Sequence, residues 1–162
     1  MILGMSIPAF TLLHVVMTLA AIGSGLIAVG GMLASRRLPA TTAVFLSTTV
    51  LTSVTGFLFP INGFTPAIGV GIVSCVILAT ALVAYYPKRL TGAWRWIYVI
   101  TSIAALYLNV FVLVVQSFVK VAGLNALAPT QSEPPFAIAQ VAVIVIFVLI
   151  GITAAVKFRP SF

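Results

Sequence analysis

Five long apolar segments, joined by short connections, constrain the fold of this chain more than any other feature. Each is long enough to cross a bilayer core, which takes about 20 helical residues. The segments cover approximately residues 8–33, 40–59, 65–86, 94–121 and 136–156. Only 6% of the 162 residues are charged, too few to cover the surface of a water-soluble domain. The sequence therefore predicts an all-α, polytopic membrane helix bundle with five transmembrane helices in one domain, residues 1–162.

Helices are favoured over the alternative, a transmembrane β-barrel. Barrel strands alternate strictly between outward and inward side chains, and this alternation is absent here. A helix also satisfies its own backbone hydrogen bonds, as the lipid interior demands. The first segment has no preceding Lys or Arg and is longer than the core of a signal peptide, so we expect a retained first helix. No internal repeat supports an inverted-repeat transporter.

Basic residues predict how the helices are oriented. Seven of the eight Lys and Arg residues fall on one side of the five-helix arrangement, and Lys120 alone falls on the other. The seven are Arg36, Arg37, Lys88, Arg89, Arg95, Lys157 and Arg159. Because basic loops stay in the cytoplasm, we expect the N-terminus outside and the C-terminus cytoplasmic. Aromatic residues typical of a membrane interface cluster on the same side: Tyr85, Tyr86, Trp94 and Trp96.

Turn residues and small residues indicate which helices are neighbours. The connection PINGFTP holds the tight-turn pair Asn62-Gly63 between two prolines, so the second and third helices should be antiparallel neighbours. Small residues recur every four positions on two helices, which favours close helix packing in a membrane. These residues are Ala20, Ser24 and Ala28 in the first helix, and Ala67, Gly71 and Cys75 in the third.

Polar side chains occur at a similar depth on four of the predicted helices. His14, Thr55, Gln116 and Gln140 each lie about 6–9 Å inside the outer end of their helix, at 1.5 Å per residue. Because intramembrane polar groups tend to face the bundle interior, we expect them to share an outward-facing pocket. Further candidates extend this ligand-binding set: Lys120 at the mouth, Asn109 deeper on the fourth helix, and Glu133 on the longest loop as part of a lid.

Structural roles are the alternative for each of these groups. Ser and Thr in the second helix can donate to carbonyls of their own helix. Gln116, Asn109 and Gln140 can join helices by hydrogen bonds worth about 0.6 kcal/mol each. His14 can be a packing histidine, although it is also the one group whose charge changes near neutral pH, so binding at the pocket would depend on pH.

Several chemistries are disfavoured by what the chain contains. With no Asp and one Glu, neither a carboxylate pair nor a Ser-His-Asp triad can be assembled. One His and one Cys make a metal site improbable, and a haem held by two histidines would need His14 from two copies. The scattered basic residues do not form the stripe of a nucleic-acid interface. We therefore expect no metal, cofactor or nucleic-acid partner, and do not expect an enzyme.

Five stretches resemble those of small bacterial multi-helix integral membrane proteins, a family without an assigned activity. The stretches are HVVMTLAAIGSG, TSVTGFLFP, GAWRWIYV, LYLNVFVLVVQ and LAPTQSEPPFAIAQ. The resemblance implies a multi-pass protein of the bacterial inner membrane and carries no functional residues with it.

The leading interpretation is a membrane protein whose outward-facing polar pocket binds or passes a small solute or ion. A second interpretation is a non-catalytic accessory or scaffold subunit, packing in a larger membrane complex or against copies of itself. The small-residue faces and the scarcity of charge favour this accessory-subunit interpretation. A quinone- or lipid-modifying enzyme is a third interpretation, but it would need more acid–base groups than the chain offers.

Overall fold

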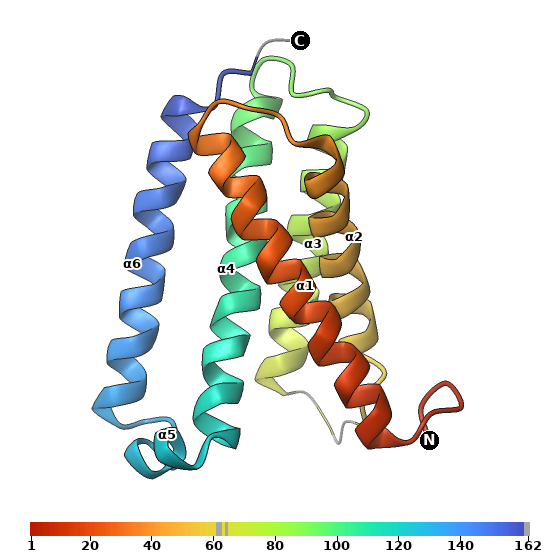
Figure 1. Cartoon of the computed structure of the whole chain (residues 1–162), viewed down its shortest axis with the longest axis vertical. Coiled ribbons are helices and arrows are strands. Elements are labelled where there is room, and N and C mark those ends of the chain that lie inside the picture. The colour runs from red at the N-terminus through yellow and green to blue at the C-terminus, as the bar shows by residue number, and fades with distance from the viewer. Residues whose placement is uncertain (61–62, 64, 161–162) are drawn as a thin grey trace.

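The computed structural model describes residues 1–60, 63 and 65–160, and these form helices joined by short loops (Figure 1). The helices are α1 Ile7–Leu33, α2 Pro39–Gly56, α3 Pro66–Tyr85, α4 Trp94–Lys120, α5 Ala122–Leu127 and α6 Pro134–Lys157. Across these residues the only β-type pairing is an isolated bridge between Ile2 and Met5. The all-α prediction is thus confirmed.

Prolines set the starts of four helices. A proline occupies one of the first two positions of α1, α2, α3 and α6, where its missing N–H breaks no helical hydrogen bond. The turn between α2 and α3 includes Gly63, whose φ of +87° suits glycine. Asn62, the other residue of the predicted turn pair, lies outside the described residues.

The short helix α5 was not predicted. It lies in the connection between α4 and α6, and Asn125 donates a hydrogen bond from Nδ2 to the Phe118 carbonyl at 3.1 Å. This contact joins α5 to the last turns of α4.

Helices α1 to α4 surround a common interior, and α6 lies outside this ring. Contacts connect α1 with α2, α2 with α3, α3 with α4, and α4 with α1. The predicted pairing of α2 with α3 is therefore present, and Figure 1 shows them running in opposite directions. Helix α6 packs against α4 and, less extensively, against α1. Helix α4 is thus the central helix of the bundle.

The two ends of the bundle are packed differently. We call the end where α1, α3 and α6 finish and α2 and α4 begin the closed end, and the opposite end the open end. Apart from Phe10 at the open end, the largest fully buried side chains gather toward the closed end, including Tyr98, Phe45, Leu46, Leu106 and Phe158. The hydrophobic core is therefore concentrated in one half of the molecule.

Gly25 brings three helices together beside this core. A Cβ atom at Gly25 would lie 2.7 Å from Leu106 Cδ1 and 2.9 Å from Phe45 Cδ2. Close approach of α1, α2 and α4 thus requires glycine here. The predicted small-residue face is rotated from the real one: Ala28 is buried, whereas Ala20 is exposed. On α3, Gly71 is in close contact as expected, because a Cβ there would lie 2.8 Å from Phe57 Cζ.

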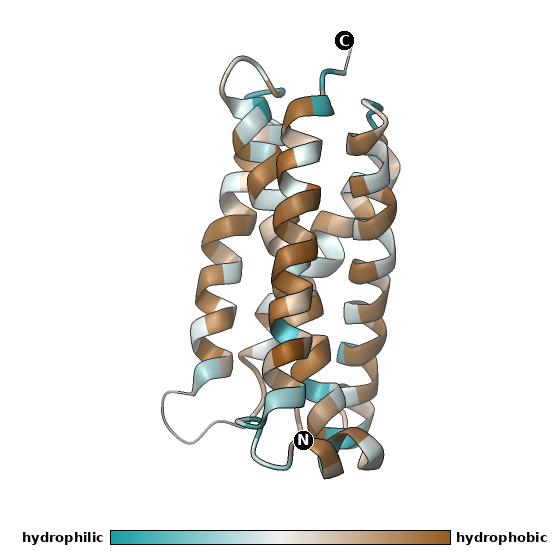
Figure 2. Cartoon of the chain, turned by 90° about the vertical axis from the view of Figure 1, so that its left-hand side faces the viewer, coloured by the Kyte–Doolittle hydropathy of each residue, from teal (hydrophilic) through white to brown (hydrophobic). Residues whose placement is uncertain are grey.

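Within the described residues, four helices are long and apolar enough to cross a membrane: α1, α3, α4 and α6. Large apolar side chains cover the outside of the bundle, and α6 is apolar along most of its length (Figure 2). Only 6% of its most apolar window is buried inside the protein, as expected of a helix surrounded by lipid. The chain is therefore a multi-pass membrane protein.

Helix α2 is the predicted span that does not meet this criterion. It has 18 residues, and its sequence PATTAVFLSTTVLTSVTG is rich in threonine and serine, which lowers its hydropathy. The structure thus supports four of the five predicted spans.

Candidate functional site

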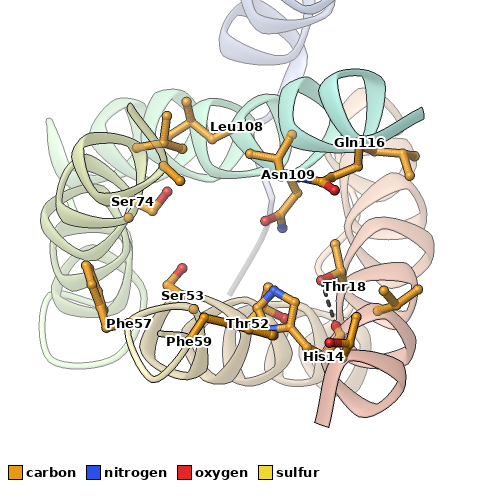
Figure 3. A pocket seen from close by; sticks show the side chains of 18 of the residues that line it. His14, Thr18, Thr52, Ser53, Phe57, Phe59, Ser74, Leu108, Asn109 and Gln116 are labelled. Atoms are coloured by element: carbon orange, nitrogen blue, oxygen red, sulfur yellow. Dashed lines mark hydrogen bonds between the residues drawn. The ribbon is translucent and has the colours of Figure 1, made fainter. Parts of the chain in front are cut away.

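A cavity of about 700 Å³ lies between α1, α2, α3 and α4 in the open half of the bundle (Figure 3). Its lining residues lie between positions 11 and 19, 52 and 59, 65 and 74, and 108 and 121. These segments are the open-end portions of the four helices and their flanking residues. The volume falls within the range of about 300–1,000 Å³ that is usual for small-molecule sites.

Most of the cavity wall is apolar. Val15, Leu19, Ile68, Leu108 and Val112 belong to it. Small residues on α2 and α3 line it as well, where bulkier side chains would fill the space: Gly56, Ala67 and Gly71. An apolar wall with a few polar groups is the usual composition of a ligand site.

His14 joins α1 to α2 at the edge of this cavity. Its Nδ1 lies 3.0 Å from Thr55 Oγ1, and its ring lies edge-on to Phe59 with centroids 5.2 Å apart. The single hydroxyl proton of Thr55 is placed for donation to the Leu51 carbonyl, at 2.7 Å. This arrangement favours a proton on His14 Nδ1, so that Nε2 of the neutral ring is a hydrogen-bond acceptor. His14 lines the cavity, and Thr55 positions it from behind.

Asn109 lies at the inner limit of the cavity, where its side chain points into the interior of the ring (Figure 3). Its Nδ2 donates to Thr49 Oγ1 at 3.3 Å, and Thr49 donates to the Phe45 carbonyl at 2.7 Å. The Asn109 amide is thus fixed to α2 through one N–H. Its other N–H and its Oδ1 can form hydrogen bonds with a solute.

Thr52 provides a second polar group at this depth. Its residue is 8% exposed, and Oγ1 has no hydrogen-bond partner within the described part of the chain. By contrast, Thr48, Thr49 and Thr55 all donate to carbonyls one turn back in α2, which confirms the structural interpretation for those three. A buried unpaired hydroxyl lining a cavity is a candidate contact for a solute or water.

Gln116 and Lys120 line the cavity from α4, closer to the open end. Among the described lining residues, Lys120 is the only charged one, and none of them is a carboxylate. The charge at the site is therefore positive, which favours neutral or anionic solutes over cations.

Three residues of the predicted set do not line the cavity: Thr55, which lies behind His14, and Gln140 and Glu133, which lie farther away. Gln140 donates from Nε2 to the Phe111 carbonyl at 3.3 Å, and its Oε1 is buried with no partner among the described residues. It faces α4 from α6, outside the ring, so it joins helices as its alternative interpretation proposed. The prediction placed Gln140 in the pocket because it lies at the same membrane depth as His14 and Gln116. Equal depth does not determine on which side of α4 the helix that carries Gln140 lies.

Glu133 precedes α6 and closes a local turn. Its carboxylate accepts hydrogen bonds from the backbone N–H groups of Thr130 and Ser132 and from the Thr130 hydroxyl, at 2.9–3.2 Å. Desolvation raises the pKa of Glu133, but hydrogen bonds from its own backbone, Thr130 and Ser132 outweigh this, so the pKa lies below its ordinary value. It is not among the lining residues, so the structure does not place it as a lid.

Thr52, Ser53 and Ser74 also line the cavity, although they were not among the residues predicted for the site. The signal for Thr52 was present, because it lies three residues from Thr55 on a helix where such positions share a face. Ser74 lies three residues from Gly71, so the small-residue face of α3 also pointed toward the interior.

No protein-family model, curated protein or solved structure matches the chain. Within the described residues, no group of three or more His, Cys, Asp or Glu side chains could hold a metal ion. Function must therefore be inferred from the chemistry of the cavity.

Proposed function

We propose that this chain is a five-span protein of the bacterial inner membrane whose open end faces outward and binds a small solute. The orientation is supported by the closed end, where seven basic residues gather. Arg95 donates to the Phe158 carbonyl there, and the Arg159 N–H donates to Ser35 Oγ at 2.9 Å. Because basic ends remain cytoplasmic, the opposite end with the cavity lies outside.

Helix α2 is the proposed fifth span. It contacts α1 and α3 within the ring, and both of these helices are apolar enough to cross the membrane. A helix in that position must connect the two ends of the bundle. Its hydroxyl groups bond to its own carbonyls or face the interior, which reduces the cost of placing them in lipid.

The observation that carries the proposal is that His14, Asn109, Gln116 and Lys120 line one cavity with otherwise apolar walls. Polar groups are costly at membrane depth, and their convergence from α1 and α4 on one space is typical of a functional site. Lys120 near the mouth would attract anionic solutes and repel cations, while admitting neutral ones. His14 Nε2 and the Asn109 amide would then orient the solute by hydrogen bonds.

Binding is the step that this arrangement supports directly. Beyond the innermost lining residues, toward the closed end, Gly25 packs against Phe45 and Leu106. Passage across the membrane would therefore require α1, α2 and α4 to separate there. A protein that passes a solute would therefore need a second conformation.

The proposal can be tested by a ligand screen on the purified full chain. Short-chain carboxylates, neutral polyols and amino acids are scored by the shift they cause in the melting temperature. A solute that binds the cavity should bind the His14→Leu and Gln116→Leu variants at least about tenfold more weakly, because each change removes a polar contact. Gln140→Leu is the matched control, since that amide lies outside the ring, and it should bind normally.

Orientation and access are tested separately with cysteine labelling in intact cells. In a Cys75→Ala background, Gln116→Cys should react with an anionic, membrane-impermeant thiol reagent added outside. If Gln116→Cys reacts only after the membrane is opened, the outward orientation is refuted. If no solute in the screen depends on His14 and Gln116, and a larger partner co-purifies in mild detergent, the accessory-subunit interpretation replaces solute binding.

A further inference from the structure

The distribution of polar and apolar groups along the cavity constrains the chemical class of its solute, and this inference rests on the solute site proposed above. Asn109 lies at the inner limit of the cavity, and Lys120 lies near its mouth. Eleven positions of α4 separate the two residues, which is about 16 Å along the helix at 1.5 Å per residue. A solute that contacts both ends of the cavity must therefore be elongated.

Neutral polar groups line the inner part of the cavity. The side chains of Ser53, Ser74 and Asn109 point into the space between the helices (Figure 3). Ser53 follows Thr49, the hydrogen-bond partner of Asn109, by one turn of α2, so it lies about 6 Å nearer the opening than Thr49. Ser74 and Asn109 are only 7% and 8% exposed. Because an ion without a countercharge is costly to bury, these groups favour a neutral hydroxyl of the solute over a charged group.

Positive charge is supplied at the other end of the cavity. Lys120 and Gln116 are four residues apart on α4, so they lie on the same side of that helix, and both line the cavity. Glu133 is at the same end of the bundle, but its carboxylate accepts hydrogen bonds from Thr130 and Ser132 in its own turn. An ammonium group and an amide N–H on one face of a helix can both donate to a carboxylate. The mouth therefore favours a solute with a carboxylate at its outer end.

The α3 side of the cavity is apolar. Apart from Ser74, the described lining residues within this helix have no polar side chain: Ala67, Ile68, Val70 and Gly71. A solute that is polar on all sides, such as a sugar, would place hydroxyl groups against this wall without hydrogen-bond partners, which is costly. An apolar chain would instead bury its surface against the wall, and binding should tighten as that chain lengthens.

We infer that the solute is a medium-chain hydroxy carboxylate, with its carboxylate at Lys120, its apolar chain along α3 and its hydroxyl at Asn109. A carboxylate without the hydroxyl would place a methyl group against Asn109 and Ser74, whose buried polar atoms would then lack the hydrogen bonds that a hydroxyl provides. A diol would make no ion pair at the mouth. An inorganic anion would leave the apolar wall uncovered.

The experiment measures binding to the purified full chain in a nonionic detergent, with the free probe determined by dialysis against protein-free micelles. The probes are 8-hydroxyoctanoate, octanoate, 1,8-octanediol and 4-hydroxybutanoate. 8-Hydroxyoctanoate should bind about fivefold more tightly than octanoate, because its hydroxyl adds hydrogen bonds, and about tenfold more tightly than 1,8-octanediol, because its carboxylate is charged. Each CH₂ added between 4-hydroxybutanoate and 8-hydroxyoctanoate should tighten binding about threefold to fourfold.

Two variants assign the two ends of the bound probe. Lys120→Gln should weaken octanoate and 8-hydroxyoctanoate about tenfold and 1,8-octanediol less than about twofold. Ser74→Ala should weaken 8-hydroxyoctanoate about fivefold and octanoate less than about twofold. The matched controls are Lys157→Gln at the closed end and Ser47→Ala, whose hydroxyl donates to the Ala43 carbonyl at 2.7 Å outside the cavity. Both controls should bind all four probes as the wild type does.

The wild-type protein alone can overturn the inference. Equal affinities for octanoate and 8-hydroxyoctanoate would show that the inner polar groups do not select a hydroxyl. Equal losses of both probes in a Ser74→Ala variant that keeps its ligand-free melting temperature would overturn the inference as well, because the hydroxyl would then not lie at the inner end.

Failure of this solute class is distinguishable from failure of the solute site. If a polyol or an amino acid binds more tightly than 8-hydroxyoctanoate and is weakened by His14→Leu and Gln116→Leu, the solute site stands and the hydroxy carboxylate is the wrong class. If no probe or solute depends on His14 and Gln116, the solute site itself is refuted, and the inference fails with it.

Discussion

Gly25→Ala is the substitution whose consequence the structure defines most sharply. The new methyl group would lie 2.7 Å from Leu106 Cδ1 and 2.9 Å from Phe45 Cδ2 and Cε2. Ordinary van der Waals contact begins at 3.4 Å, so both side chains would have to move. Leu106 and Phe45 are each 0% exposed, so neither can move toward solvent, and any shift must displace neighbouring core residues. We therefore expect α1 to be pushed away from α2 and α4.

The magnitude follows from overpacking in a full core, which costs about 1–3 kcal/mol. Replacing glycine by alanine in a helix usually returns about 0.5–1 kcal/mol through backbone entropy. In a membrane, however, the separate helices persist when tertiary packing is lost, so most of that gain cancels between the two states. Gly25→Ala should thus lower the free energy of unfolding by about 1–3 kcal/mol.

Gly23→Ala is the matched control on the same helix. A Cβ atom at Gly23 meets nothing within 4 Å, so this change should alter the free energy of unfolding by less than about 0.5 kcal/mol. Both variants can be unfolded with sodium dodecyl sulfate in mixed micelles and followed by tryptophan fluorescence and circular dichroism. If Gly25→Ala is as stable as Gly23→Ala, the three-helix contact that closes the cavity is not where we place it.

Three further predictions concern the polar groups. A double-mutant cycle with His14→Leu and Thr55→Val should give a coupling free energy of about 0.6 kcal/mol, the average for hydrogen bonds between membrane helices. A coupling free energy of zero would show that this contact does not contribute to the site. Gln140→Leu should change the free energy of unfolding by less than about 1 kcal/mol, because it removes one weak hydrogen bond together with an unpaired buried oxygen; a loss of more than about 2 kcal/mol would show a larger structural role. The folded-state pKa of Glu133 lies below the unfolded value, so its stabilisation of the turn is present above the unfolded pKa and is lost as the pH falls through the folded pKa. Amide-exchange protection of Thr130 and Ser132 should decrease in acid, and Glu133→Gln should abolish this pH dependence; persistence of the dependence in that variant would assign it to another group.

The helices could be predicted closely because prolines mark where they start. The structure begins α1 at Ile7 and α3 at Pro66, within one residue of the prediction. Helix α2 ends at Gly56 instead of residue 59, because the chain forms a turn after Gly56, ahead of Pro60. Helix α5 was missed because its six residues carry no capping signal, and it depends on the tertiary contact of Asn125 with α4.

The site could be predicted only in part, because a sequence gives the depth of a side chain but not which helices are neighbours. Counting residues from the helix ends placed His14, Gln116 and Gln140 at one level. The cavity is lined by the first two, while Gln140 faces the other side of α4. The ring of four helices follows from packing around Gly25 and Gly71. The small-residue spacing marked the face of α3 that holds Gly71, but it could not show which helix packs against that face.

The low hydropathy of α2 is explained by its position in that ring. Val44, Leu51 and Val54 are each about half exposed, and this spacing places them on one outward-facing side. The buried threonines of the helix face inward, and Thr52 lines the cavity itself. A helix with lipid on one side and a polar cavity on the other needs apolar residues on only part of its surface, so its average hydropathy falls below that of a helix such as α6. The feature that keeps α2 below the criterion for a span is therefore the one expected of a span that lines a polar cavity, and this supports the five-span proposal.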